Sequence, residues 1–155
     1  MIWILAGAIL VAADQLTKLW AVTSLKGQAS VSFIPKLLQF TYVENTGIAF
    51  GMLKGMHWLV IPINIVIMTA CVLMARSYNK KGAKLAVVAL CMIVSGAFGN
   101  MLDKIFKGYV VDFIETVFVE FPVFNVADIL VCCGAALLCI YVVFFDKEEK
   151  NGNHL

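Results

Sequence analysis

Two aspartates, Asp112 and Asp128, have the clearest potential for chemistry in this sequence. Asp128 lies in FPVFNVADILVCC, where an apolar segment long enough to cross a bilayer opens with polar residues. An ionised carboxylate in hydrocarbon costs about 2.5–3.5 kcal/mol on insertion scales, so it is rare unless a function requires it. No single basic residue is placed to neutralise both acids. The pattern therefore predicts a functional site.

Two carboxylates held close together can perform acid and base catalysis. At ~4 Å and an effective dielectric constant near 20, their repulsion is about 4 kcal/mol, which corresponds to roughly three pKa units. One group would keep a proton while the other stays ionised, which supplies a general acid and a general base. Water would be the nucleophile, so we expect no metal or other cofactor. A peptide bond presented at a membrane surface is the natural substrate.

The composition places these acids in a membrane protein. The chain of 155 residues is 62% hydrophobic and 14% charged, whereas soluble domains are about 45–50% apolar. Each of four apolar segments, at 2–25, 57–76, 83–101 and 126–145, is close to the ~20 residues of a spanning helix. We therefore expect an all-α integral membrane protein with four transmembrane helices and a single domain, 1–155. The net charge of +2 gives no indication of a nucleic-acid partner.

Basic residues predict the orientation of the helices. The run RSYNKKGAK connects the second and third segments, which favours the cytoplasmic side for this connection. Both termini, including the tail 146–155, would then be cytoplasmic. Alternation in VSFIPKLLQFTYVEN predicts a small extracytoplasmic β-region within 28–55, between the first two helices. The connection 103–125 is predicted to be an outer loop.

Polar residues inside three helices fall at one depth. With a rise of ~1.5 Å per residue, Asp14, Asn100 and Asp128 lie roughly 20, 24 and 27 Å from the cytoplasmic end. This layer is near the outer boundary of a ~30 Å hydrocarbon core. Asp112 reaches the same layer from the outer connection.

Each of these residues also has a purely structural interpretation. Asp14 and Lys18 are four residues apart, which suits an ion pair on one helix face. Asn45 and Gly47 in ENTGIAFG are common turn residues, and GAFGN, which ends at Asn100, can pack helices through small side chains. These alternatives stay open on the sequence alone.

Five blocks in order give the chain a specific resemblance. It is similar to the lipoprotein signal peptidase, or signal peptidase II, family over nearly its whole length. The blocks are DQLTK from Asp14, NTGIAF from Asn45, GAFGNMLDK from Gly96, VVDFIE from Val110 and FNVAD from Phe124.

The resemblance implies an aspartic endopeptidase of the bacterial plasma (inner) membrane. We expect the chain to be a monomer, although its sequence carries no direct sign of its oligomeric state. It would bind membrane lipid and diacylglyceryl-modified prolipoproteins, and would cut before the lipidated cysteine near the outer surface. By motif position Asp112 and Asp128 match the catalytic pair. Residues that bind substrate or order the site would be Asp14, Lys18, Asn45, Gly47, Asn100, Lys104, Asn125 and Ala127. Lys104 stands where the family usually has arginine, so the geometry of any contact there would differ.

Other functions predict other patterns. A four-helix proton-coupled transporter could also use membrane carboxylates, but it would place them near the midplane on a path open to both sides. A scaffold without enzymatic activity would tolerate asparagine at Asp112 and Asp128. A nucleophilic pair of Cys132 and His57 is a further, weaker alternative, because the five cysteines show no metal or catalytic spacing.

Overall fold

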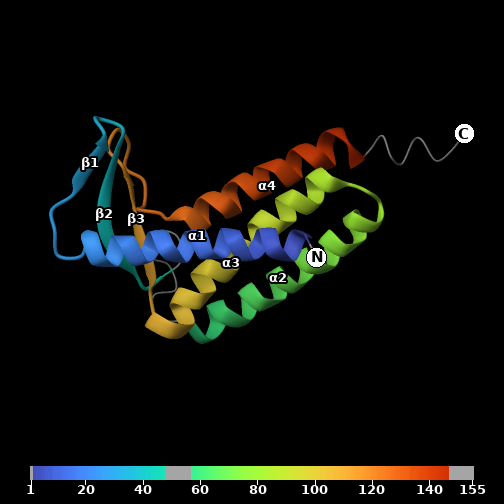
Figure 1. Cartoon of the computed structure of the whole chain (residues 1–155), viewed down its shortest axis with the longest axis horizontal. Coiled ribbons are helices and arrows are strands. Elements are labelled where there is room, and N and C mark those ends of the chain that lie inside the picture. Colours follow the sequence, from blue (N-terminus) through green and yellow to red (C-terminus); the bar gives the residue numbers. More distant parts are fainter. Residues whose placement is uncertain (1, 48–56, 147–155) are drawn as a thin grey trace, which may run out of the picture.

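The computed structural model describes residues 2–47 and 57–146, which fold into a bundle of helices with a sheet at one end (Figure 1). The helices are α1 (Ile2–Ser24), α2 (His57–Lys80), α3 (Lys84–Lys107) and α4 (Val126–Phe144), and the strands are β1 (Val31–Ile34), β2 (Leu38–Asn45) and β3 (Val110–Thr116). Positions 48–55 of the predicted β-region and 147–155 of the predicted tail lie outside the described residues.

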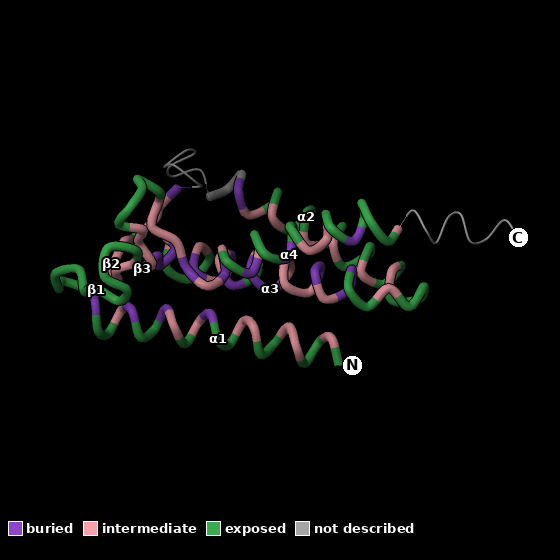
Figure 2. The backbone as a smooth tube through the Cα atoms, turned by 90° about the horizontal axis from the view of Figure 1, so that it is seen from above, coloured by how far each residue is buried: buried purple, intermediate pink, exposed green. Residues whose placement is uncertain are grey.

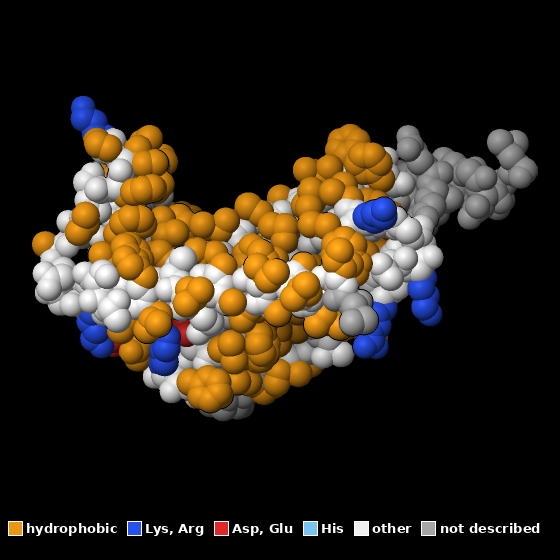
Figure 3. Space-filling model, in the orientation of Figure 1, with side chains coloured by type: hydrophobic (Ala, Val, Ile, Leu, Met, Phe, Trp, Pro, Cys, Tyr) orange, Lys and Arg blue, Asp and Glu red, His pale blue; other side chains and the backbone are white. Residues whose placement is uncertain are grey.

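All four described helices are long and apolar enough to cross a membrane. Large apolar side chains on them face outward, and Ile4 and Val66 are 78% and 68% exposed. Figure 3 shows hydrophobic side chains over the middle of the bundle, with lysine and arginine side chains toward its two ends. A surface of this kind is stable in lipid and not in water, so the predicted multi-pass membrane fold is confirmed.

Two helices are longer than the sequence predicted. α2 continues to Lys80 instead of ending at 76, and α3 continues to Lys107 instead of ending at 101. The prediction stopped where charged residues begin, but lysine and arginine are good helix formers. Their long side chains also reach water from a helix end. α3 ends where Gly108 adopts a left-handed conformation with φ of 79°, a common way for a helix to terminate.

The sheet contains a strand that the sequence prediction missed. Its order is β1-β2-β3, with both pairs antiparallel. β3 lies within 103–125, which was predicted to be only a loop, so the sheet draws on both long connections. The first four residues of β3 are all buried, and a strand buried on both faces lacks the alternation that marks a half-buried strand.

A small core attaches the sheet to the end of α1. Ala21 and Leu25 pack against Val111 and Phe113 of β3. The Trp20 ring lies edge-on to Phe113, with 5.9 Å between ring centroids. Figure 2 shows that the buried positions of α1 lie in the half next to the sheet, whereas the N-terminal half is more open.

α3 is the central helix, because α1, α2 and α4 all pack on it. Its contact with α4 is close enough to exclude side chains at two glycines. A Cβ atom at Gly96 would lie 2.4 Å from the Ala127 carbonyl oxygen, and one at Gly134 would lie 2.7 Å from the Ala89 carbonyl oxygen. Small residues of this kind let helix backbones approach in membranes.

We predict that Gly134→Ala destabilises the bundle by about 1–3 kcal/mol, because the new methyl group overlaps backbone that cannot move away. Thermal unfolding in detergent measures the effect. The control is Cys133→Ala, which changes the exposed neighbouring position and should leave the midpoint nearly unchanged. Equal midpoints for the two variants would contradict the close packing of α3 and α4.

Candidate active site

Asp112 lies in β3 and is held in place by the strand. Only 2% of it is exposed, and its neighbours Val111 and Phe113 belong to the core under the sheet. The backbone N–H of Val111 donates a hydrogen bond to Asp103 Oδ2 at 3.1 Å. Because Asp103 is on α3, this bond joins the strand to that helix and fixes the position of the Asp112 carboxylate.

Asp128 lies in the first turn of α4, where it forms a capping box with Asn125. The Asn125 side chain accepts a hydrogen bond from the Asp128 backbone N–H at 3.1 Å, and the Asp128 carboxylate accepts one from the Asn125 backbone N–H at 3.1 Å. These bonds satisfy two backbone donors at the helix start. A negative charge there also interacts favourably with the helix dipole. The same residue pair therefore starts the helix and orients Asp128.

Three asparagine side chains connect the two aspartates. Asn125 Nδ2 donates to Asp112 Oδ1 at 2.6 Å, and Asn45 Nδ2 donates to Asp112 Oδ2 at 2.9 Å. Asn100 Nδ2 donates to Asp128 Oδ1 at 2.8 Å. Asn125 thus contacts the Asp112 carboxylate through its side-chain amide and the Asp128 carboxylate through its backbone N–H. The structure brings together the two predicted aspartates and all three predicted asparagines.

A fully buried lysine lies behind the asparagines. Lys18 Nζ is 3.0 Å from Asp14 Oδ2 and 3.3 Å from Asp103 Oδ2, and all three side chains are 0% exposed. It also donates to Asn100 Oδ1 at 2.8 Å. The same amide oxygen accepts from Asn125 Nδ2 at 3.1 Å. The buried charge is therefore continuous, through hydrogen bonds, with the aspartate pair.

Asp14 connects this lysine to α4. Its Oδ1 accepts a hydrogen bond from the Ala127 backbone N–H at 3.0 Å. A side chain at Gly99 would place a Cβ atom 2.4 Å from Asp14 Oδ2, so glycine is needed there. The structural interpretation of Asp14 and Lys18 as an ion pair is correct, and the pair also braces the site.

Two further predicted residues lie beside the aspartates. The Gly47 backbone N–H donates to Asn45 Oδ1 at 3.0 Å, so Asn45 forms the expected turn while its amide nitrogen reaches Asp112. Lys104 is half-buried on α3, and its charge interacts with both Asp112 and Asp128. The Lys104 ammonium group forms no hydrogen bond or ion pair with a residue that the structure describes.

Asp103 is a site residue that sequence reasoning missed. It is the first residue of the predicted outer loop 103–125, but in the structure it lies on α3 and is 1% exposed. Its carboxylate contacts Lys18, Lys107 at 2.8 Å and the Val111 N–H. The spacing of Asp103 and Lys107 could have indicated this. The two residues are four apart, which places an acid and a base on the same face if the helix continues through them.

The environment of Asp112 favours its protonated form more than water does, so its pKa is higher than that of an ordinary aspartate. Burial raises the pKa of Asp112 to about 6, and the charge of Asp128 acts in the same direction. Hydrogen bonds from Asn45 and Asn125 oppose this shift because they stabilise the ionised form. Asp112 can therefore gain or lose a proton close to neutral pH, as acid–base catalysis requires.

The structure does not support the alternative of a nucleophilic pair formed by Cys132 and His57. Cys132 is exposed on α4, and the side chain of His57 lies outside the described residues. Among the residues that the structure describes, no three His, Cys, Asp or Glu side chains are arranged to hold a metal ion.

Comparison with known proteins identifies the family. Residues 6–144 match the model of the family described as signal peptidase (SPase) II. A lipoprotein signal peptidase of Streptococcus agalactiae serotype Ia is 37% identical over 147 residues, covering 94% of this chain and 92% of that protein. One from Clostridioides difficile strain 630 is 35% identical over 151 residues, covering 97% and 100%. The chain belongs to the signal peptidase II family.

Solved structures agree with this assignment. A bacterial membrane enzyme determined by the in meso method superposes with a TM-score of 0.82 at 33% identity, covering 99% of this chain and 91% of that one. A second such structure gives 0.79 at 34% identity, covering 92% and 93%. The chain is accordingly a membrane peptidase of the aspartic type, and nothing in the comparisons supports a transporter.

We predict that Lys18→Met destabilises the fold by about 3–5 kcal/mol, because it leaves Asp14 buried without a counter-charge and removes one of the two lysines that contact Asp103. Chemical denaturation in detergent measures the loss. The matched control is Lys26→Met, which removes an exposed ion pair with Glu44 and should change stability little. If Lys18→Met unfolds at the same denaturant concentration as Lys26→Met, Lys18 does not hold the site together.

Proposed function

We propose that Asp112 and Asp128 are the catalytic pair with which this peptidase removes signal peptides from prolipoproteins. The observation that carries the proposal is the contact of Asn125 with both carboxylates, one from β3 and one from α4. Two separate elements thus present acids to one point at the end of a membrane bundle. Family membership supplies the substrate class, since the relatives from Streptococcus agalactiae and Clostridioides difficile are lipoprotein signal peptidases.

The roles of the two acids follow from their burial. Asp112 is the more buried of the two, so we assign the proton to Asp112 and the ionised form to Asp128. Asp128 then takes a proton from water, whose oxygen attacks the carbonyl carbon of the scissile peptide bond. Asp112 gives its proton to the nitrogen of the leaving cysteine as the carbon–nitrogen bond breaks. After the products leave, the proton that Asp128 took from water passes to Asp112, which restores the starting state of the pair.

Lipid anchoring of the substrate accounts for a site at the end of the bundle. An acyl chain contributes roughly 0.8 kcal/mol per buried CH₂, so a diacylglyceryl group on the cysteine holds the scissile bond at one depth. Positioning of this kind lowers the barrier, because the reactants meet already oriented. Lys104 supplies a positive charge beside the pair, suited to a carbonyl or phosphate-ester oxygen but without the planar fork of arginine.

The proposal includes an orientation and an oligomeric state. The basic connection from Arg76 to Lys84 favours the cytoplasmic side for that end, so both termini are cytoplasmic. The sheet and the aspartate pair then lie near the outer surface of the bacterial plasma membrane, where a secreted precursor arrives. One chain supplies every contact described around the pair, which supports a monomer as the working unit.

Substitution tests the catalytic assignment. We predict that Asp112→Asn and Asp128→Asn each reduce cleavage of a diacylglyceryl-cysteine signal peptide by about 10²–10⁴-fold, the usual contribution of acid–base groups. Asp146→Asn, which changes an aspartate at the far end of α4, should cleave normally. An unlipidated peptide should be cut poorly by every form. Normal cleavage by either of the first two variants, with folding verified, would show that the pair has another role.

The rate should also depend on pH in a specific direction. Asp112 must be protonated to act as the acid, so cleavage falls as the pH rises through about 6. Asn45→Ala removes a hydrogen bond that stabilises ionised Asp112, which raises the pKa of Asp112. The decline in the cleavage rate should therefore move to higher pH in this variant. A pH–rate profile of both forms measures the shift. If the decline in rate moved to lower pH in Asn45→Ala, Asp112 would be excluded as the acid.

A further inference from the structure

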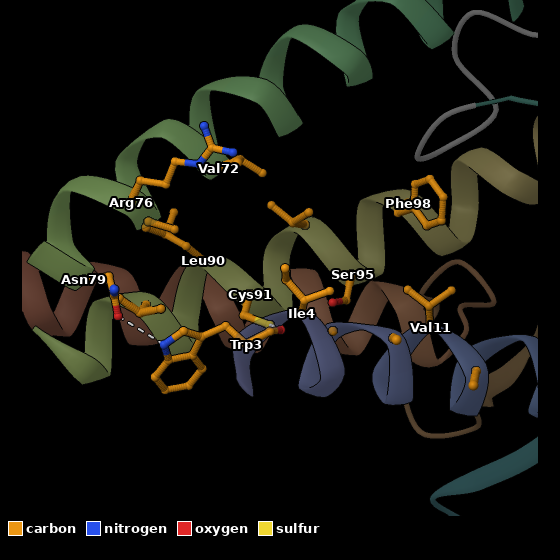
Figure 4. Close-up of a pocket in the computed structure, with 16 residues that line it drawn as sticks. Trp3, Ile4, Val11, Val72, Arg76, Asn79, Leu90, Cys91, Ser95 and Phe98 are labelled. Carbon is orange, nitrogen blue, oxygen red and sulfur yellow. Dashed lines mark hydrogen bonds between the residues drawn. The ribbon is translucent and has the colours of Figure 1, made fainter. Parts of the chain in front are cut away.

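A cavity that shares no lining residue with the aspartate pair lies between α1, α2 and α3. Its volume is about 790 Å³, and its wall is mostly apolar, with Ile4, Val11, Val72, Leu90, Val94 and Phe98 among the lining residues. Figure 4 shows Ile4 and Val11 on α1, Val72 on α2, and Leu90 and Phe98 on α3, around the space between these helices. None of the ten predicted site residues lines it.

One end of this cavity is polar. Trp3, Arg76 and Asn79 lie there, while Val11 and Phe98 lie toward the other end (Figure 4). Trp3 Nε1 donates a hydrogen bond to Asn79 Oδ1 at 3.1 Å, which joins α1 to α2. The Arg76 guanidinium forms no hydrogen bond or ion pair with any described residue. A cation with five donors is therefore available at the mouth of an apolar cavity.

The depth of the cavity corresponds to one leaflet of a bilayer. Its lining on α3 runs from Val87 to Phe98, a distance of about 16 Å at a rise of ~1.5 Å per residue. This is roughly half of a ~30 Å hydrocarbon core. A tryptophan beside the polar end also fits the level of the lipid headgroups, where its amphipathic ring is favoured.

We propose that this cavity binds an anionic phospholipid from the leaflet at the Arg76 end of the bundle. The phosphate lies at Arg76 and an acyl chain occupies the apolar part. Charge supports this ligand, because Lys80, Lys81 and Lys84 follow Arg76 closely, whereas Asp146 is the acid that the structure describes at this end. Basic pockets between transmembrane helices are suited to anionic headgroups.

The same charges disfavour the other apolar ligand of this protein, the hydrophobic helix of a signal peptide. Signal peptides carry a positively charged N-terminal region, which the basic residues around Arg76 would repel. An anionic lipid has the opposite sign at the corresponding position. The proposal is independent of the cleavage reaction, so it can fail or succeed while the catalytic assignment stands.

Native mass spectrometry of the full chain in detergent tests the proposal. Phosphatidylglycerol and phosphatidylcholine with identical acyl chains are the probes, and we expect phosphatidylglycerol to bind more tightly. Arg76→Gln should weaken phosphatidylglycerol binding about fivefold, the usual effect of one basic residue near a lipid headgroup, and leave phosphatidylcholine unchanged. Lys80→Gln is the matched control, because Lys80 is at the same end but does not line the cavity, so its loss should weaken phosphatidylglycerol binding less than the loss of Arg76.

A second variant tests the apolar part of the cavity. Ala8 lines it from α1 and is exposed, so Ala8→Phe should fill space, keep the fold and weaken both lipids. Equal loss of phosphatidylglycerol in Arg76→Gln and Lys80→Gln, or full binding by Ala8→Phe, would overturn the proposal. Displacement of the lipid by an unlipidated signal peptide would also overturn it and would assign the cavity to the peptide.

Discussion

The buried ammonium group of Lys18 is the constraint on which the rest of the site depends. Removing a charge from water is costly, and the cost is recovered only with well-placed counter-charges and hydrogen bonds. Lys18 has two carboxylates and one amide oxygen within 3.3 Å. Those partners come from α1 and α3, and the two carboxylates in turn accept backbone N–H groups from α4 and β3. One charge therefore sets the positions of three helices and a strand.

The same charge determines which way the asparagine amides face. Because Asn100 Oδ1 accepts from Lys18, its Nδ2 is turned toward Asp128. Asn125 Nδ2 donates to Asn100 Oδ1 and to Asp112, while its Oδ1 accepts the Asp128 backbone N–H. Each amide has one orientation that satisfies all its partners. Hydrogen bonds in such a chain polarise one another, so the aspartates receive donors whose directions are set by Lys18.

Much of this arrangement could be predicted from the sequence. Apolar segment length predicted the four helices, and the rise per residue predicted that Asp14, Asn100 and Asp128 share one depth, as their hydrogen bonds confirm. Asp103 and β3 were missed for related physical reasons. A charged residue near a predicted helix end is ordinarily solvated, but burial of Asp103 is favourable here because Lys18, Lys107 and the Val111 N–H contact its carboxylate. A strand such as β3, buried on both faces, carries no alternation, so its pairing with β2 appears only in three dimensions.

The most direct measurement of the central claim is infrared spectroscopy of the carboxyl carbonyl band as a function of pH, in detergent. The account predicts a band from protonated Asp112 that disappears with a midpoint near pH 6. That band should be absent in Asp112→Asn and retained in Asp146→Asn. A chain with no carboxyl group titrating near pH 6, or a band that persists in Asp112→Asn, would contradict the assignment of the proton to Asp112.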